Sequence, residues 1–363
     1  MPNGTVETLL ATDAADAERW DASVRSAADP DVYYLPAYVR ATAELECSEP
    51  FAVIAGTDPH KILAPLLVRN MSACIDGSEV EWKDACSPYG YGGLLSLSSD
   101  SGKVEAKVLE NFIAGLDSWC RERNLVCCVL RLHPLINQFE WVLPQQYGAG
   151  FLRVRQRGTT SAIDLKNWES ENSRPRGMRK DRREDLNRAR RNLRVTWKSG
   201  EETDIESSLD LFFRIYGNAL QQLQADEFYR FPRSYFSRLA ALGPQLGLAF
   251  VWLGDELVGA NLFLAGVRFA HGHLAGTNDV GRKNGAATLL LVEGSRWARQ
   301  RGCELLHLGG GVAPGDRLED FKRSFGGPTF HYAFALYVAD PLRFEQLCRT
   351  PNPPWPYRIS EIE

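Results

Sequence analysis

The chain has 363 residues, of which 44% are hydrophobic and 24% charged, and its 42 Lys and Arg against 46 Asp and Glu give a formal net charge of -4. This composition excludes collagen-like, disordered and disulfide-scaffold proteins. The length favours two packed domains over a single oversized core.

Nothing in the sequence indicates a membrane span or a secreted protein. The most apolar stretch, which begins at Gly247, is interrupted by Asp255 and Glu256, so the sequence contains no run of 18 or more apolar residues that could cross a bilayer. The N-terminal residues lack the basic start and apolar stretch of a secretory signal. The eight cysteines contain no C-x-x-C pair, which favours reduced thiols over a zinc site or disulfides. We therefore expect a soluble, cytoplasmic protein.

The first half of the chain alternates short apolar strands with a helix. Strands are predicted at residues 51–56 and 62–68. Residues 104–123 carry apolar side chains at helical spacing, and a buried strand follows at 125–132.

The second half repeats this order, with strands at 248–254 and 256–266, a helix at 286–301 and a strand at 303–309. Both helices end in the pattern W-x-R-x-R-x, beginning at Trp119 and Trp297. These matches predict a duplicated α/β domain.

Between the halves lies a polar junction, roughly residues 145–175, followed by a strongly basic segment. From Arg174 to Arg194 there are ten basic and three acidic residues, a charge of +7 within a chain of net charge -4. A helix is predicted from about Met178. It is interpreted either as a solvated helix tied by i, i+4 ion pairs or as a binding surface for phosphates.

A second candidate anion site is the R-x-x-G-x-A pattern formed by Arg282, Gly285 and Ala287, between a predicted strand and a helix. The amide groups at a helix N-terminus bind pyrophosphate well. The alternative is an ordinary turn in which Gly285 supplies backbone freedom.

The most specific stretch is Leu306–Gly327, in which a strand ends in three consecutive glycines. Such a run is costly unless the backbone must approach something closely. Asp316 is predicted to cap the following helix, with Glu319 three residues on. Lys322 lies beside the apolar face of that helix, where it either extends to water or supplies a fixed positive charge to a cleft.

Histidines provide a weaker signal. His271 and His273 are expected on one strand face, and without a third ligand of the right kind they are interpreted as a polar cleft wall, so no metal site is expected. His307 is interpreted as a core or cleft residue. The chain contains no G-x-S-x-G, Walker or G-x-G-x-x-G pattern.

Four motifs in chain order resemble the FemABX-like family. They are the basic K-x-R-R segment, EFYRFPRSYF, the helix with R-x-x-G-x-A, and LHLGGG followed by D-x-L-x-x-F-K-x-x-F-G. The first half contributes mainly SPYGYGG. The resemblance implies an α/β (α+β) protein with two tandem GNAT-like domains, each a mixed, mostly antiparallel sheet flanked by helices.

The expected domains are residues 1–150, residues 151–345, which carry the donor site, and a C-terminal tail at 346–363. The resemblance further implies an acyltransferase that moves an aminoacyl group from aminoacyl-tRNA to an amine, such as that of a peptidoglycan-precursor stem peptide. Two alternatives remain open: an acyl-CoA-dependent N-acetyltransferase, which the R-x-x-G-x-A pattern favours, and a non-catalytic binding module. No tightly bound cofactor is expected, only the co-substrate.

The resemblance also assigns roles to individual residues. The expected catalytic residues are Lys322 and Phe321, with Lys322 supplying charge to the oxyanion or to the donor's terminal phosphate. The expected donor-binding residues are Arg282, Gly285, Ala287, Gly309, Gly310, Gly311, Arg179, Arg182 and Arg183. The expected acceptor-binding residues, in a groove between the domains, are Tyr229, Arg230, Tyr89, Tyr91 and His273.

Overall fold

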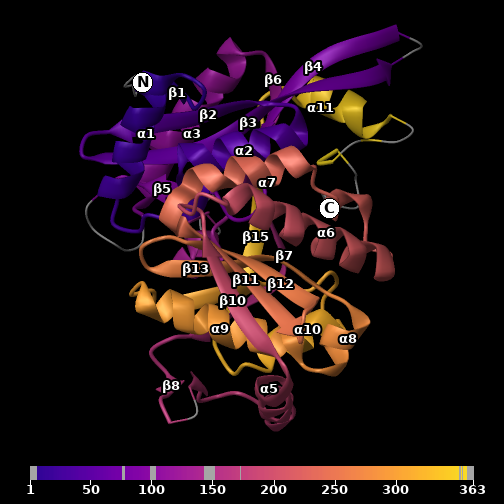
Figure 1. The fold of residues 1–363 in the computed structure, drawn as a ribbon. Coiled ribbons are helices and arrows are strands. Elements are labelled where there is room, and N and C mark those ends of the chain that lie inside the picture. Colours follow the sequence, from indigo (N-terminus) through magenta and orange to yellow (C-terminus); the bar gives the residue numbers. More distant parts are fainter. Residues whose placement is uncertain are drawn as a thin grey trace. The chain divides into compact units, whose positions relative to one another are not determined.

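The computed structural model describes residues 6–75, 78–98, 104–142, 152–171, 173–350, 353 and 355–357 (Figure 1). The chain forms two compact units, Met1–Arg157 with His331–Glu363 and Gly158–Phe330. This division differs from the expected one, because the residues from 331 onward belong to the first unit rather than to the second domain and a separate tail.

The first unit is a sheet with helices packed on it. Its helices are α1 (Ala14–Ser26), α2 (Pro36–Glu46), α3 (Ala106–Glu122), α4 (Gln138–Val142) and α11 (Pro341–Cys348). Its strands are β1 (Glu7–Leu10), β2 (Glu49–Thr57), β3 (His60–Ile75), β4 (Ser78–Cys86), β5 (Leu95–Ser96), β6 (Leu125–Arg131) and most of β15 (Thr329–Val338). The order is β1-β2-β3-β4-β6-β15, with β5 on β3, and in this unit the described neighbours are antiparallel except β4 and β6.

The core of this unit explains why the C-terminal residues belong to it. Phe112 and Leu116 of α3 pack with alternate side chains of β2 and β3. Ala333 and Ala335 of β15 are fully buried in the same cluster, and β15 pairs with β6 from Phe334↔Arg131 onward. Burial of this alternating apolar face holds β15 in the first unit.

The second unit has the same kind of architecture. Its helices are α5 (Lys180–Asn192), α6 (Ile205–Gln222), α7 (Arg233–Leu239), α8 (Asp279–Lys283), α9 (Ala286–Gln300) and α10 (Arg317–Arg323), with the short 3-10 helices η3 (Glu227–Tyr229) and η4 (Ala240–Gln245). Its strands are most of β7 (Leu152–Asp164), β10 (Arg194–Ser199), β11 (Leu246–Leu253), β12 (Glu256–Ala265), β13 (Phe269–Thr277) and β14 (Leu305–Gly309), in the order β7-β14-β13-β12-β11-β10. Only β13 and β14 are parallel within this described sheet.

Helices cover both faces of the second sheet (Figure 1). A side chain at Gly259 of β12 would meet α9, whereas one at Gly276 of β13 would meet α6. Gly259 pairs with Thr277 and the adjacent Ala260 pairs with Gly276, and successive pairs of a ladder point to opposite faces. Helices α9 and α6 therefore pack on opposite sides, and the glycines allow close approach.

The two units repeat one arrangement. In each, a strand, a long helix and a second strand parallel to the first follow one another, as β4, α3 and β6 and as β13, α9 and β14. Helices α3 and α9 end at Glu122 and Gln300, inside the two W-x-R-x-R-x segments. The predicted fold class, a duplicated unit with a mixed, mostly antiparallel sheet and flanking helices, is confirmed.

The division between the units, after Arg157, falls inside the predicted polar junction, but much of the described part of that junction is a strand. Its described part contains β7 and the small β8 (Trp168–Glu169) and β9 (Arg174–Pro175) pair. Strand β7 begins in the first unit and ends in the second, because the division falls after Arg157. The alternating charged side chains at the start of β7 hide the strand from a search for apolar runs.

Candidate functional site

The parallel strands at the centre of the second unit separate after a short contact. Pairing between β13 and β14 extends only from Phe269↔Leu305 to His271↔His307. Strand β13 continues to Thr277 along β12, while β14 pairs with β7 up to Gly309↔Ser161. In the described sheet, the β13 edge from Gly272 to Thr277 therefore has a strand partner on one side only. Ligands of open α/β sheets bind where neighbouring strands diverge in this way.

The glycine run closes β14 and approaches the chain's own backbone and side chains. Gly309 has a φ of 72°, which lies in the left-handed region and favours glycine. A Cβ on Gly310 would lie 2.9 Å from the Thr159 carbonyl oxygen, and one on Gly311 would collide with the Asp316 carboxylate. The glycine run was predicted to approach another group closely. Thr159 and Asp316 account for at least part of that approach.

Asp316 organises the loop that follows the glycines. Its carboxylate accepts hydrogen bonds from the amides of Val312 at 2.6 Å and Ala313 at 3.0 Å. It also caps α10 by accepting from the Glu319 amide at 2.7 Å, as the sequence predicted. Hydrogen bonds from the Ala313 and Glu319 amides lower the pKa of Asp316. A single carboxylate therefore fixes both the loop and the start of the helix that carries Lys322.

Lys322 is held against the glycine run. Its Nζ donates a hydrogen bond of 2.6 Å to the Gly310 carbonyl oxygen. Burial lowers the pKa of Lys322 to about 8, although Asp316 acts in the opposite direction. Of the two interpretations of this lysine, the structure supports a positioned, partly desolvated charge over an ammonium group extended into water.

Phe321 anchors the same helix from the neighbouring position. Its ring packs edge-on to Phe325, with centroids 5.5 Å apart, and carries the Arg182 guanidinium 5.4 Å above it. Phe325 is fully buried in the core of the second unit. Phe321 thus orients α10 and, through it, Lys322.

Removing the Asp316 carboxylate should loosen this loop. We expect Asp316→Ala to lower the free energy of unfolding by about 1–3 kcal/mol, because a helix cap and two loop hydrogen bonds are lost. Hydrogen exchange should accelerate at the Val312, Ala313 and Glu319 amides. Since the pKa of Asp316 is lowered in the folded chain, its contribution is present at neutral pH and is lost as the pH falls through that lowered value. Asp316→Asn, which keeps one acceptor oxygen, is the matched control, and unchanged exchange in Asp316→Ala would contradict this role.

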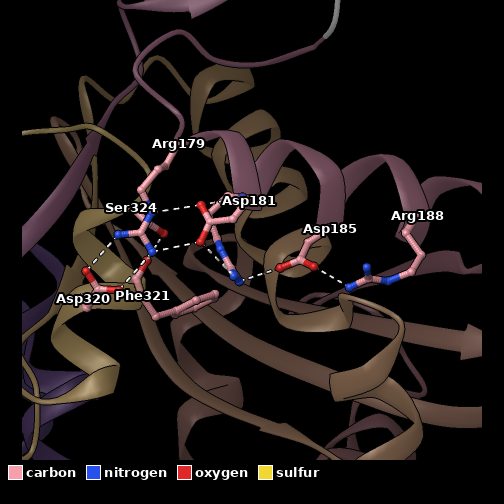
Figure 2. Close-up of polar contacts among 8 residues, drawn as sticks. Arg179, Asp181, Asp185, Arg188, Asp320, Phe321 and Ser324 are labelled. Atoms are coloured by element: carbon pink, nitrogen blue, oxygen red, sulfur yellow. Dashed lines mark hydrogen bonds and ion pairs between the residues drawn. The ribbon is translucent and has the colours of Figure 1, made fainter.

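Several arginines of the basic segment have partners within the second unit, among them Arg179 and Arg188 (Figure 2). Arg179 donates to both Asp181 and Asp320, with four contacts of 2.9–3.0 Å. Hydrogen bonding to Arg179 lowers the pKa of both carboxyl groups. Its link to Asp320 joins the start of α5 to α10. Arg179 therefore positions the helix of Lys322, a contact that the sequence did not reveal.

Arg182 and Arg183 also have internal partners. Arg182 pairs with Asp181 at 3.3 Å and with Asp185 at 2.6 Å. Arg188 pairs with the other carboxylate oxygen of Asp185 (Figure 2). Arg183 donates to the Met178 carbonyl oxygen at 2.9 Å. At these positions the basic helix is therefore tied by internal pairs, which is the first of its two interpretations. A phosphate at Arg179 or Arg182 would compete with carboxylates.

The R-x-x-G-x-A residues lie where β13 leads into α9, but α8 intervenes between them. Gly285 has a φ of 78°, and a Cβ there would lie 2.7 Å from the Asp185 carbonyl oxygen, so the glycine allows α9 to approach α5. Arg282 pairs with Asp279 and donates to the Thr277 carbonyl oxygen at 2.7 Å. No side chain caps α9, which begins at Ala286, next to Ala287.

The expected acceptor residues are divided between the units. Tyr229 and Arg230 lie at η3, where the Tyr229 carbonyl oxygen accepts from Tyr216 at 2.8 Å and Arg230 faces Glu227 at 3.6 Å. His273 lies on β13 and is hydrogen-bonded through Nε2 to the Tyr235 hydroxyl at 2.6 Å.

Tyr89 and Tyr91 belong to the first unit. The Tyr89 carbonyl oxygen accepts from the Tyr38 hydroxyl at 2.6 Å. The Tyr91 ring packs edge-on to Tyr33 and Tyr332, with centroids 5.8 and 5.1 Å away.

Three features of this region were not found from the sequence. Tyr235, from the EFYRFPRSYF segment, is fully buried and bonded to His273. Burial and the neighbouring His271 lower the pKa of His273 to about 3, so this ring is neutral at physiological pH. His271 and His307, both buried, lie with Nδ1 atoms 3.4 Å apart where β13 and β14 separate. Only the alignment of the two strands brings them together.

Residues 176–323 match the family model described as an acetyltransferase (GNAT) domain. This range covers the glycine run, α9 and Lys322, and it lies within the second unit. The match identifies an acyltransferase domain. No curated protein matches the chain by sequence.

Two solved structures share the fold over nearly the whole chain. FemX is 11% identical, with 91% of this chain and 97% of that chain covered and a TM-score of 0.67. L-PGS from Bacillus licheniformis is 14% identical, with 92% and 95% covered and a TM-score of 0.56. The resemblance to FemABX-like proteins is thereby confirmed at the level of the fold. Among the described helices, none is both long and apolar enough to cross a membrane.

Proposed function

We propose that the chain is an N-acyltransferase whose second unit transfers an acyl group from an activated ester or thioester to an amine. The observation that carries this proposal is the position of Lys322, whose Nζ is held at the Gly310 carbonyl oxygen within the acetyltransferase domain. The carboxylate of Asp316 and the pairing of Arg179 with Asp320 fix the same helix. This support makes Lys322 a preorganised charge.

The chemistry fits a partly desolvated ammonium group. The neutral amine attacks the carbonyl carbon, and negative charge develops on the carbonyl oxygen. The C–O or C–S bond then breaks as the amide forms, and the proton lost by the nitrogen passes through water to the leaving oxygen or sulfur, so the donor departs as its alcohol or thiol. A fixed positive charge stabilises that oxyanion most strongly where water is scarce. With a pKa of about 8, Lys322 is mainly protonated at neutral pH. In this proposal it supplies that charge or holds the donor's terminal phosphate, and Phe321 positions it.

The first candidate donor is aminoacyl-tRNA, with an amine such as that of a peptidoglycan-precursor stem peptide as acceptor. The shared fold with FemX and L-PGS supports this candidate, as does the basic segment at the start of the second unit. Because Arg179 and Arg182 are paired with carboxylates, phosphate binding by these residues requires exchange of partners. Arg183, whose partner is a backbone carbonyl, is free of that requirement.

The second candidate donor is acyl-CoA. A specific observation favours it: the β13 edge beyond His271 has no partner in β14, and the uncapped start of α9 follows at Gly285. An extended thioester arm pairs well with a free strand edge, and a helix N-terminus suits a pyrophosphate. In this arrangement Arg282, Ala287 and the loop of Gly309, Gly310 and Gly311 surround the donor.

In the second unit, the acceptor-binding residues are proposed to be Tyr229, Arg230 and His273. The acceptor role expected of Tyr89 and Tyr91 is a proposal for the first unit by itself. Rings with a polar tip and an arginine suit an acceptor that carries both hydroxyl and carboxylate groups. The neutral His273, held by Tyr235, offers hydrogen bonding without charge. It would leave the charge of an approaching amine undisturbed.

The donor is decided by a paired assay on the full chain. Radiolabelled aminoacyl-tRNA and acetyl-CoA are each incubated with a nucleotide-linked muropeptide and with a panel of small amines, and acyl transfer and donor binding are both measured. We expect transfer from aminoacyl-tRNA. Transfer from acetyl-CoA alone would replace the first donor by the second. The absence of both transfer and donor binding would favour the non-catalytic module. Lys322→Ala serves as the inactive control.

A further inference from the structure

Two buried histidines of the second unit meet at the point where β13 and β14 separate. His271 and His307 are partners in the parallel ladder, and each is only 1% exposed. Their Nδ1 atoms lie 3.4 Å apart, and their rings are nearly perpendicular, with centroids 5.5 Å apart. The sequence pattern grouped His271 with His273, a near neighbour on the same strand, whereas the ladder groups it with His307.

The two imidazole rings lie on the face of the sheet that α6 covers. Ala270 and Leu306, the preceding pair of the ladder, are buried in the core with α9. Because successive pairs of a ladder point to opposite faces, His271 and His307 point away from α9. Their strands are also paired on the outer sides, with β12 and with β7. Side chains on such rigid elements are positioned more precisely than side chains on loops.

The separation of the two Nδ1 atoms suits a shared metal ion better than a direct hydrogen bond. The 3.4 Å between them is longer than the usual length of a hydrogen bond from an N–H donor, about 2.7–3.2 Å. In a tetrahedral zinc site, bonds from zinc to nitrogen of about 2.0–2.1 Å place two ligand nitrogens about 3.3–3.4 Å apart. The distance between the Nδ1 atoms therefore matches that of two imidazoles bound to one ion.

We infer that His271 and His307 bind a zinc ion through their Nδ1 atoms. Imidazole nitrogen is a good ligand for Zn²⁺ and its neighbours in the first transition row, whereas Mg²⁺ and Ca²⁺ prefer oxygen. The two imidazoles fill two positions of a tetrahedral ion, and water or a substrate atom takes the others. The ion ties β13 to β14 at the last pair of their ladder. This inference does not rest on the proposed acyl transfer, because metal binding is measured by itself.

The test uses Zn²⁺ as the probe and isothermal titration calorimetry on the full chain, prepared without a histidine tag and stripped of metal with EDTA. We expect saturable binding of one Zn²⁺ per chain, which an excess of Mg²⁺ does not displace. His271→Gln and His307→Gln should each weaken binding by about tenfold or more, since even the loss of a group that only orients a ligand costs that much. His60→Gln, which replaces an exposed histidine of the first unit, is the matched control and should leave binding unchanged.

A measurement on the unmodified chain separates metal binding from folding. In protein with nitrogen-15-labelled histidines, Zn²⁺ should move the Nδ1 resonances of His271 and His307 and leave that of His60 in place. Zn²⁺ should also raise the melting temperature of the unmodified chain, because it binds the folded state. The inference is overturned if Zn²⁺ does not bind saturably, if Mg²⁺ displaces it, or if the two Nδ1 resonances do not move. It is also overturned if the chain with both glutamine replacements binds Zn²⁺ as tightly as the unmodified chain.

Discussion

Replacing Lys322 by alanine should reduce the rate of acyl transfer by about 10²–10³-fold, the usual cost of losing one group that stabilises an oxyanion. The fold should persist, because Lys322 lies on a short helix that is capped by Asp316 and held to the core by Phe321. The measurement is kcat with the donor identified by the paired assay, together with a thermal melt.

The pH dependence distinguishes two roles for the same side chain. The pKa of Lys322 is about 8, so if the charged form is needed, kcat should fall as the pH rises through that value. If the neutral amine instead accepts the proton of the attacking ammonium group, kcat should rise over the same range. We expect the first profile, and we expect Lys322→Arg, which stays charged, to retain more activity than Lys322→Gln.

A matched control is available in the second unit. Lys198 of β10 forms ion pairs with Glu202 and Asp204, each at 2.9 Å. In the strand order of the sheet, β10 is separated from β13 and β14 by β11 and β12. Lys198→Ala should keep normal turnover. A folded Lys322→Ala protein with full turnover would refute the role assigned to Lys322.

The second large effect is expected in the first unit, where Asp84→Ala should lower the free energy of unfolding by about 3–5 kcal/mol. The change leaves the buried Arg69 guanidinium without its two-point carboxylate partner, with only Glu46 still paired to it at 3.2 Å. Arg69 donates to Asp84 at 2.9 and 2.7 Å, and the Asp84 side chain is fully buried. The Tyr357 hydroxyl also donates to Asp84, at 3.1 Å. Denaturant unfolding measures the change, with tryptophan fluorescence as the probe.

The double replacement tests the physical cause. Arg69→Met with Asp84→Leu removes both charges and should cost much less than Asp84→Ala alone, because apolar side chains of similar size can replace a buried pair. The exposed pair of Lys107 and Glu110 is the control, and Glu110→Ala should cost no more than about 1 kcal/mol. A cost below about 1 kcal/mol for Asp84→Ala would contradict the prediction.

Much of the fold could be predicted because its signals are local. Apolar runs and helical spacing predicted β2, β3, α3, β6, β11, β12, α9 and β14, and the two W-x-R-x-R-x segments predicted the duplication. Strand β7 was missed, because Arg153, Arg155 and Arg157 occupy alternate positions in its first half and leave no apolar run. The membership of β15 in the first unit was also missed, since it depends on pairing with β6, which is distant in the sequence.

The candidate site was predicted only in part. The sequence identified the glycine run, the cap at Asp316 and the special position of Lys322, because each is a short-range pattern. It indicated a binding role for Arg179, but did not show its pairing with Asp320, 141 residues away. Tyr235 and His271 lie in segments that the sequence singled out, but their hydrogen-bond partners, like the ring contacts of Arg131, come from other elements of the fold.

The length and composition alone determined that the chain forms globular units, and periodicity along the chain determined their type and repetition. Only the tertiary structure decided which arginines are paired with carboxylates and which are not. A segment of +7 suggested a surface open to phosphates, yet Asp181, Asp185 and Asp320 pair with several of its arginines. Four arginines without ion pairs in the described part of the chain, Arg131, Arg153, Arg155 and Arg157, lie instead on the first unit. The reason is physical: net charge adds along a sequence, whereas neutralisation depends on distances of a few ångströms between side chains that only folding brings together.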